Sequence, residues 1–533
     1  MIHTLKPILS FFILLLPFAV YAQVEEEKDW HHKDPTTDGI LGVGSERAYQ
    51  LLKDRKSTKV MVAILDSGFD INHEDLKDNL WVNEDEIAGN GIDDDQNGYI
   101  DDVHGWNFLG NAEGVNLDQA NLEVTRIYRT LAPRFRTVKS KKEIAKEDLE
   151  DYHLFLKTQN ELVENLNETA SELGQIEAFM NAYTTADSTA KSLFGINYSI
   201  DDILAWEPEN GNDLLHQSVL SSLLQDASFS ANELEAYYIH LQEKLQYYYN
   251  PQFVDRSFLG DDYTNTEERF YGNNDISAPH NDHGTHVAGI VGAVNDNAIG
   301  INGLCKNVAL MLVRTVPNGD EFDKDVANAI RYAVDNGASI INMSFGKAYS
   351  PQVEAVHSAI RYAEEHNVLL VHGAGNDSQN LDKTANFPNP DYTFQNNPCS
   401  TWLSVGASSF AENENLVGVF SNYGKKKVSL FAPGVQVYST KPDNTYEFED
   451  GTSMAAPVVS GVAALIKSYF PALTAVELKD LLLASVTTLP KTKVFLPAAN
   501  QNPRKRVKFK ILSASGGIVN AYNAAKLALA QHP

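Results

Sequence analysis

The sequence predicts an α/β protein with a mainly parallel central sheet, interrupted by a mostly helical insertion. Two observations predict the sheet: short, continuous apolar runs recur along the chain, and segments with helical spacing lie between them. Strands that are apolar on both sides are typical of a parallel sheet whose two faces are covered by helices. A third observation, a change of composition between residues 111 and 270, predicts the insertion.

The predicted strands are short runs rich in Val, Ile, Leu and Ala. A fully buried strand appears in a sequence as a continuous apolar run rather than as an alternating one. Between the later runs, apolar residues recur at helical spacing over 325–336 and 353–366, which predicts two helices. The predicted strands are residues 60–65, 308–313, 338–343, 368–371 and 402–405.

The segment from residue 111 to 270 has helical spacing, no strand pattern and no catalytic motif. A Ser230-x-x-Glu233 sequence resembles a capping box and predicts the start of one helix. We therefore expect one α/β domain in two parts, 23–110 and 271–533, with 111–270 inserted between them. An earlier amphipathic helix or helix pair is predicted by Leu149, Tyr152, Leu156, Val163, Leu166, Ala170, Leu173, Ile176 and Met180, which recur mostly at three, four and seven residues.

Composition excludes several classes of protein. The chain has 533 residues, 43 % of them hydrophobic, which is enough to bury a sizeable core. It carries 43 Lys and Arg against 71 Asp and Glu, a net charge of −28, so we expect no nucleic-acid partner, because binding phosphates needs a basic surface. The basic run 504–510 alternates with apolar residues and predicts an exposed edge strand guarded by charge.

The first 22 residues are typical of a secretory signal peptide. Lys6 precedes an apolar run over 8–16, and Val20 and Ala22 are small residues before the predicted cleavage site, after Ala22. The alternative is a membrane anchor, but the run is short for a span and Pro17 interrupts it. We expect an exported protein, secreted or periplasmic, that is not an integral membrane protein. After export Cys305 and Cys399 either pair or stay free, which the sequence leaves open.

Three segments each carry a reactive residue where a strand or loop meets a helix. Asp66 ends the apolar run 60–65, and active sites of open α/β sheets gather at the carboxyl ends of strands. His283 lies where a helix is expected to begin, with Asp282 as its cap. Ser453 precedes a helix crowded with small residues, which let a helix bury itself deeply. A serine nucleophile, a histidine base and an aspartate that orients the histidine are the requirements of acyl transfer.

Acyl transfer also needs hydrogen-bond donors for the oxyanion of the tetrahedral intermediate. Asn376 follows the apolar run 368–371 and is expected to offer its side-chain amide beside the Ser453 backbone N–H. His286, three residues after His283, is expected to pack in the core rather than to bind zinc, since no third ligand motif accompanies it.

Four motifs together resemble those of the subtilisin-like serine proteases, the subtilases or peptidase family S8. They are DSG around Asp66, HGTHVAG from His283, AGN ending at Asn376 and GTSMAAP around Ser453, and they follow the family's order. The resemblance covers residues 56–108 and 271–528. It implies a three-layer subtilisin-like fold and a serine endopeptidase that cleaves polypeptides through an Asp-His-Ser triad without an organic cofactor.

The resemblance also implies that Ser344, Phe345 and Gly346 form the edge segment that pairs with the substrate backbone. Two other functions stay open at this stage. One is a catalytically silent binding protein on the same fold, with the insertion as its interaction surface. The other keeps the triad but transfers the acyl group to an amine or cleaves esters.

The sequence departs from the family in two respects. Asp66 and His283 are 217 positions apart, where relatives need a few tens, and the insertion that fills this gap is expected to restrict access, bind a partner or assist folding. Relatives commonly carry an N-terminal pro-domain, but only about 43 residues separate Ala22 from Asp66. We therefore expect folding without a separable pro-domain.

A second site is predicted in the acidic segment 90–102. Its residues occupy the first, third, fifth and sixth places of an EF-hand-like loop, and hard oxygen ligands on a tight turn suit Ca²⁺. At the twelfth place His104 replaces the usual Glu, so Asp101 or Asp102 is expected to supply that carboxylate. The alternative is a solvated acidic turn. The candidate ligands of a structural Ca²⁺ are Asp93, Asp95, Asn97, Tyr99 and Asp101.

Overall fold

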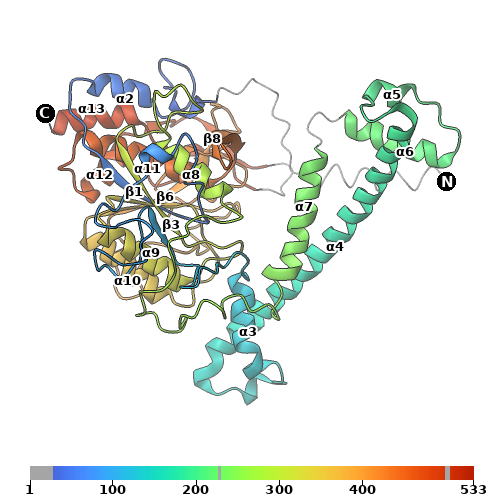
Figure 1. Cartoon of the computed structure of the whole chain (residues 1–533), viewed down its shortest axis with the longest axis horizontal. Helices are drawn as coiled ribbons and strands as arrows, with labels where there is room; N and C mark the ends of the chain where they lie inside the picture. The colour runs from blue at the N-terminus through green and yellow to red at the C-terminus, as the bar shows by residue number, and fades with distance from the viewer. Residues whose placement is uncertain (1–27, 226–229, 499–503, 533) are drawn as a thin grey trace. The chain divides into compact units, whose positions relative to one another are not determined.

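A computed structural model describes residues 28–225, 230–498 and 504–532, so the predicted signal peptide lies outside the described residues (Figure 1). The chain divides into two units: unit 1 comprises Met1–Asp118 and Ser257–Pro533, and unit 2 comprises Gln119–Arg256. Unit 2 lies within the predicted insertion, whose outer residues 111–118 and 257–270 belong to unit 1.

Unit 1 is built around a sheet of nine strands, in the order β10-β13-β7-β6-β5-β4-β1-β3-β2. All neighbours are parallel except β10 and β13, which confirms the predicted, mainly parallel sheet. Each predicted apolar run forms one of these strands. The strands are β1 (Val60–Asp66), β2 (Gly105–Asn107), β3 (Val308–Arg314), β4 (Ile340–Met343), β5 (Leu369–Gly373), β6 (Trp402–Ser408), β7 (Leu430–Pro433), β10 (Thr487–Thr488) and β13 (Gly517–Ile518).

Helices cover both faces of this sheet. Val62 and Ile64 of β1 point into a core shared with α8 and α11, while Ala63 and Leu65 point into a second core shared with α9 and α10. Successive side chains of a strand point to opposite faces, so a strand between two cores has to be apolar throughout. The helices are α2 (Ser45–Leu52), α8 (Asp282–Gly292), α9 (Asp323–Asp335), α10 (Val353–Glu365), α11 (Thr452–Tyr469), α12 (Ala475–Ala484) and α13 (Ala521–Gln531).

Two small antiparallel sheets and short helical turns complete unit 1. β12 contains the exposed Arg506 and Lys508 and pairs with β11, as expected for a charged edge strand. The remaining elements are β8 (Val437–Lys441) with β9 (Thr445–Glu449), β11 (Lys493–Phe495) with β12 (Arg506–Lys508), and the turns η1 (Trp30–His32), η2 (Lys77–Asn79) and η6 (Phe509–Ile511).

Unit 2 is helical, and one helix of 46 residues, α4, runs through it (Figure 1). Its first half packs on α3 through Tyr128, Phe135 and Phe155, and its second half packs on α5 and α6 around Trp206 and Leu220. The elements are α3 (Glu123–Phe135), η3 (Lys141–Glu143), η4 (Lys146–Asp148), α4 (Leu149–Phe194), α5 (Ile200–Ala205), α6 (Gly211–Leu224), α7 (Ala231–Glu243) and the π-helical turn η5 (Lys244–Tyr248).

The predicted amphipathic helix is therefore a single helix, and its buried side matches the predicted one in part. Tyr152 and Ile176 are buried as predicted, whereas Leu156 and Val163 are exposed. The spacing located the helix correctly, and the neighbouring helices decide which of its sides is covered. Ser230 caps α7 by accepting a hydrogen bond from the Glu233 N–H, which is one half of the predicted capping box.

Two further expectations can be compared with the structure. Cys305 and Cys399 are both buried and both free, Cys305 in the core beside α8 and Cys399 in the core beside α10. Within the part of the chain that the structure describes, no helix combines the length and apolarity needed to cross a bilayer.

Candidate active site

The four predicted catalytic residues meet in one cleft of about 490 Å³ at the carboxyl edge of the sheet. Asp66 ends β1, and Asn376 follows β5. Because parallel strands end at the same edge, loops that are distant in sequence come together there. The predicted substrate-binding residues Ser344, Phe345 and Gly346, which follow β4, line the same cleft.

Asp66 and His283 are in direct contact in the site. The Nδ1 atom of His283 lies 2.7 Å from Oδ1 of Asp66, and the Asp66 side chain is 2 % exposed. Burial by itself lowers the pKa of the imidazole, but the charge of Asp66 and the hydrogen bond to it outweigh burial and raise the pKa of His283 to about 9. The carboxylate thus orients the ring and leaves Nε2 for proton transfer.

The start of α8 differs from the prediction in one detail. Asn281, not Asp282, is the N-cap residue, and no side chain caps the helix. Asp282 is already the first helical residue, and its carboxylate binds the Lys441 ammonium at 3.1 Å.

His286 is fully buried, its Nε2 lies 3.1 Å from the Glu447 carbonyl, and burial lowers its pKa to about 4, as expected for a packed, neutral histidine.

Ser453 is the second residue of α11, so its backbone N–H has no partner within the helix. Its hydroxyl donates to the Ser344 carbonyl at 3.0 Å, and the Ser344 hydroxyl donates to the Ser453 carbonyl at 2.8 Å. The Ser453 hydroxyl therefore has to rotate from Ser344 toward His283 to be activated. Catalytic hydrogen bonds often align only when substrate is in place.

The predicted crowding of small residues after Ser453 explains how α11 lies so deep in unit 1. Ala455, Ala456 and Ala463 are fully buried. A side chain at Gly461 would lie 2.6 Å from Cβ of Leu304, closer than van der Waals contact permits. Ser460, the residue before Gly461, donates to Oδ1 of Asn342 at 2.8 Å, which ties the helix to β4.

Thr452 orients Asn376, a role that sequence reasoning missed. The Thr452 backbone N–H and hydroxyl both donate to Oδ1 of Asn376, at 3.0 and 2.9 Å. The Thr452 hydroxyl also accepts from the Gly375 N–H at 3.0 Å. With its oxygen held in this way, Asn376 keeps its NH₂ group for a ligand in the cleft, as an oxyanion donor requires.

A second wall of the cleft also escaped the sequence analysis. Residues 316–321, between β3 and α9, line it together with Asn386. No motif marks this loop, and the signal available in the sequence was its position directly after a buried strand. It places two adjacent carboxylates, Asp320 and Glu321, in the lining of the cleft.

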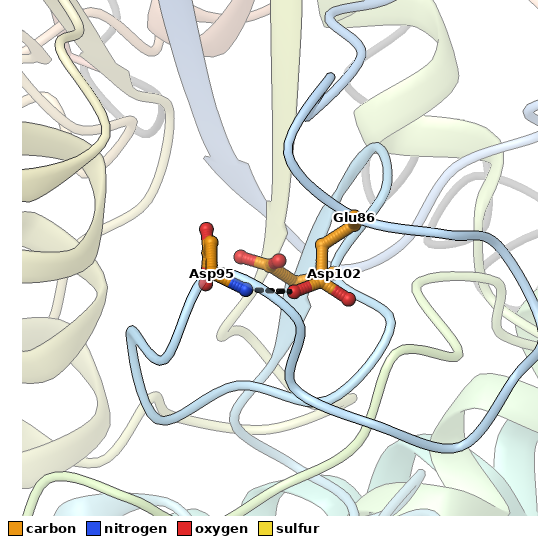
Figure 2. Close-up of side chains that lie close together, drawn as sticks. All are labelled: Glu86, Asp95 and Asp102. Atoms are coloured by element: carbon orange, nitrogen blue, oxygen red, sulfur yellow. Dashed lines mark hydrogen bonds between the residues drawn. The ribbon is translucent and has the colours of Figure 1, made fainter.

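Three carboxylates converge in the predicted metal segment. Single oxygen atoms of Glu86, Asp95 and Asp102 all lie within 4.8 Å of one another, and Figure 2 shows the three side chains close together, with the Asp95 backbone N–H donating to Glu86 Oε1. Asp102 is fully buried, and burial raises its pKa to about 6 although Tyr332, Asn83 and Asn97 donate hydrogen bonds to it. Three carboxylates so close together favour a cation between them.

Among the five predicted ligands, Asp95 is the one that belongs to this group. Asp93 accepts hydrogen bonds from the backbone N–H groups of Asn97 and Gly98. Asp101 has a positive φ of 55°, and its carboxylate accepts hydrogen bonds from the backbone N–H groups of Asn90 and Gly91 at the start of the segment. The Asn97 NH₂ group donates to Asp95 and Asp102, and the Tyr99 ring packs on Trp106.

A family model described as "Subtilase family" matches residues 57–504. This chain belongs to the subtilase family, which confirms the resemblance carried by the four motifs.

Characterised relatives match the chain in part. Subtilisin DY of Bacillus licheniformis is 36 % identical over 211 residues, which are 39 % of this chain and 72 % of that protein. A thermophilic serine proteinase of Bacillus sp. (strain AK1) is 38 % identical over 189 residues, 35 % of this chain and 43 % of that protein. Thermitase of Thermoactinomyces vulgaris is 36 % identical over 189 residues and is matched over 62 % of its length. The chain thus spans about half of several of these relatives.

One solved structure extends over nearly the whole chain. It is described as a protease from Pseudoalteromonas arctica PAMC 21717 and is 19 % identical in sequence. The alignment covers 94 % of this chain and 97 % of that one, with a TM-score of 0.47.

Proposed function

We propose that this protein is an exported serine endopeptidase that hydrolyses polypeptides. The observation that carries the proposal is the 2.7 Å contact between His283 and Asp66 in the same cleft as Ser453 and the anchored Asn376. Each group fills a separate requirement of acyl transfer: nucleophile, base, orienting carboxylate and oxyanion donor.

In the first half-reaction Ser453 Oγ attacks the scissile carbonyl carbon while His283 Nε2 takes the hydroxyl proton. Asp66 stabilises the resulting imidazolium, and the Asn376 amide and the Ser453 N–H bind the negatively charged oxygen. The imidazolium then protonates the leaving amine, the C–N bond breaks, and an acyl-enzyme remains on Ser453. In the second half-reaction water attacks the ester, His283 takes its proton, and the Ser453 hydroxyl is restored.

Peptide digestion tests this function directly. Purified protein and its Ser453→Ala variant would be incubated with a mixture of unmodified peptides, and the products identified by mass spectrometry. We expect internal cleavage by the wild type and a loss of about six orders of magnitude in the variant, the size of effect known for a subtilisin nucleophile. If added amines capture most of the acyl groups in place of water, the result favours a transferase. If the folded wild type leaves the peptides intact, the result favours a binding protein.

Export is proposed from the predicted signal peptide. Expression in a bacterial host with a secretory pathway, followed by N-terminal sequencing of the exported protein, should yield chains that start at Gln23. Retention of Met1 in a membrane fraction would contradict cleavage after Ala22 and favour the anchor.

We further propose that Ca²⁺ binds among Glu86, Asp95 and Asp102 and stabilises the loop. A ligand that binds only the folded state adds about 2.7 kcal/mol of stability at a hundredfold excess over its Kd. We expect chelation by EDTA to lower the Tm and Ca²⁺ to restore it. Asp102→Asn should abolish the change of Tm with Ca²⁺. Asp93→Asn removes a residue of the EF-hand-like set that lies outside this group, so it should leave that change in place. The exposed Asp54→Asn serves as a control. A Tm that ignores Ca²⁺ would contradict the site.

A further inference from the structure

A second pocket of unit 1 is lined by arginines and lies apart from the catalytic cleft. Its volume is about 330 Å³, and its lining residues all differ from those of the cleft. They come from α9, from α10 and from the segment 266–269, and α9 and α10 cover the face of the sheet opposite to α8 and α11. Each of the three contributes one arginine to the pocket: Arg331, Arg361 and Arg269.

Arg331 has only weak hydrogen-bond partners. Its guanidinium donates to Oδ1 of Asn328 at 3.4 Å and to the Ala355 carbonyl at 3.5 Å, and both acceptors are neutral. An N–H to oxygen hydrogen bond usually measures about 2.7–3.2 Å, so both bonds are long. Among the residues that the structure describes, no carboxylate forms an ion pair with Arg331. Because the side chain is partly buried, its poorly satisfied donors favour an additional acceptor.

The other two arginines also have donors to spare, since a guanidinium has five N–H groups. A terminal nitrogen of Arg269 lies 3.7 Å from Oδ2 of Asp335, whereas a charge-assisted hydrogen bond usually measures about 2.7–2.9 Å. Arg361 is better engaged: Nε donates to Glu365 at 2.8 Å, and Nη1 donates to Gln395 at 2.7 Å. These two bonds leave Nη2 of Arg361 for a further acceptor.

Like charges lie close together in this lining. Partial burial and the charge of Arg269 lower the pKa of the Arg331 guanidinium. The carboxylates of Glu267 and Asp335 oppose this decrease, but Glu267 is exposed and Asp335 already accepts a hydrogen bond from the Tyr362 hydroxyl at 2.6 Å. An anion placed between two guanidinium groups is attracted by both and offsets their mutual repulsion.

We propose that this pocket binds a phosphate or sulfate group, either as the free ion or as part of a small molecule. A tetrahedral oxyanion offers acceptors in several directions. Guanidinium groups from three separate segments, with the hydroxyls of Thr266 and Ser358 in the same lining, suit it better than they suit the single plane of a carboxylate. The inference is independent of the proposed peptidase function, because it uses none of the residues of the cleft.

Isothermal titration calorimetry tests the proposal with two probes, inorganic phosphate for the free ion and phenyl phosphate for a group carried on a small molecule. The full chain would carry Ser453→Ala, which lies outside the pocket and excludes digestion of one molecule by another. We expect saturable binding at one site, weakened by NaCl because salt screens charges in an open pocket. The probe that binds more tightly identifies the source of the group. Saturable binding of neither probe would overturn the proposal.

Substitution of the arginines tests whether the binding occurs in this pocket. Arg331→Gln removes the charge and keeps a chain of similar length, and it should weaken binding about 10- to 100-fold, the range of one charge-assisted hydrogen bond. Arg269→Gln, at a side chain that is 36 % exposed, should weaken it in the same direction and keeps the test valid if Arg331→Gln does not fold. The control Arg506→Gln removes the same charge from exposed β12 and should leave the affinity unchanged. An affinity that both pocket variants leave unchanged would overturn the proposal.

Removal of a carboxylate separates anion binding from a general loosening of the fold. Glu267→Gln takes one negative charge from the lining and should tighten phosphate binding about two- to threefold at low salt, because like charges repel. A destabilised pocket would bind more weakly, so the direction of the change distinguishes the two. Weaker or unchanged phosphate binding by the folded Glu267→Gln protein would contradict the site.

Discussion

Two helices illustrate how differently the two units bury their side chains. In unit 1, α11 has 18 residues, of which 15 are buried, and its second residue is Ser453. In unit 2, α4 has 46 residues, of which 8 are buried. A helix enclosed on all sides has one position, set by many contacts, whereas a long exposed helix depends mainly on its own hydrogen bonds and a few small clusters.

The dense packing of unit 1 lies where the positions of side chains have to be precise. The proposed nucleophile, oxyanion donor and base have to be held to within fractions of an ångström, and α11, the strand ends and α8, which carry them, are all locked by packing. Unit 2 holds its helices together through separate clusters, one around Trp206 and another around Leu162. We therefore expect changes in unit 1 to be felt in the chemistry and changes in unit 2 to stay local.

Among the substitutions that compare the two units, we expect the greatest loss of activity at Asn376, the proposed oxyanion donor. Asn376→Ala should lower kcat about 10²- to 10³-fold with a smaller effect on KM, since the amide acts on the transition state. Thr452→Val removes the hydroxyl that holds Asn376 and should lower kcat by about tenfold, the worth of one hydrogen bond. Steady-state kinetics on one peptide measures both. Equal losses in kcat and 1/KM for Asn376→Ala would contradict the role.

A matched pair of core substitutions tests the contrast between the units. Leu465 of α11 and Leu162 of α4 are 0 % and 3 % exposed. Leu465→Ala should lower the free energy of unfolding of unit 1 by about 2–5 kcal/mol, because the surrounding core cannot collapse onto the cavity. Leu162→Ala should accelerate hydrogen exchange in unit 2 alone. Faster exchange in β1 and β3 of the Leu162→Ala variant would contradict the expectation that changes in unit 2 stay local.

The pH dependence should reveal how Asp66 tunes His283. Only the neutral imidazole accepts the Ser453 proton, so kcat/KM should rise with pH, with a midpoint above 6.5 and toward about 9. The contribution of His283 to the free energy of unfolding changes with pH in the opposite direction to kcat/KM. Its pKa is raised in the folded state, so that contribution is present below about pH 6.5 and is lost as the pH rises through the folded pKa. A flat kcat/KM profile from pH 5 to 9 would contradict the role of the base.

The smallest effect is expected from removing unit 2. The chain on either side of it is already joined within unit 1, where Asn111 donates to the Phe258 carbonyl at 3.1 Å. Replacing 119–256 with a short Gly-Ser linker should leave unit 1 folded and the hydrolysis of short peptides changed by no more than a few-fold. Circular dichroism and kcat/KM measure this. Loss of folding would show that the insertion assists folding of unit 1.

The sequence predicted most of unit 1 because its strands are buried on both faces. The runs 60–65 and 308–313 form β1 and β3, because a short, continuous apolar run is typical of a strand that is buried on both faces. The first residue of α8 was misjudged by one position, because Asp282 suits a cap as well as a first turn. Which side of α4 is covered depends on contacts with neighbouring helices, and Leu156 and Val163 alone do not reveal it.

The site was predictable where motifs mark it and obscure where only folding assembles it. Asp66, His283, Asn376 and Ser453 each lie in a distinctive motif, and all four line the cleft. Glu86 lies outside the EF-hand-like segment, and a turn of the backbone brings it to Asp95 and Asp102. Likewise, the wall at Asp320 and Glu321 is recognisable once β3 and β4 bring their loops to the same edge of the sheet.

The proposed catalysis requires that Ser453 is an activated nucleophile within the group formed with His283 and Asp66. Treatment of the intact protein with a fluorophosphonate, followed by peptide mapping, tests it without any assumption about substrate. We predict a single label on Ser453 in the wild type and none in Ser453→Ala, with labelling slowed below the pKa of His283. An unlabelled Ser453 in the folded wild-type protein would contradict a nucleophilic role for this serine.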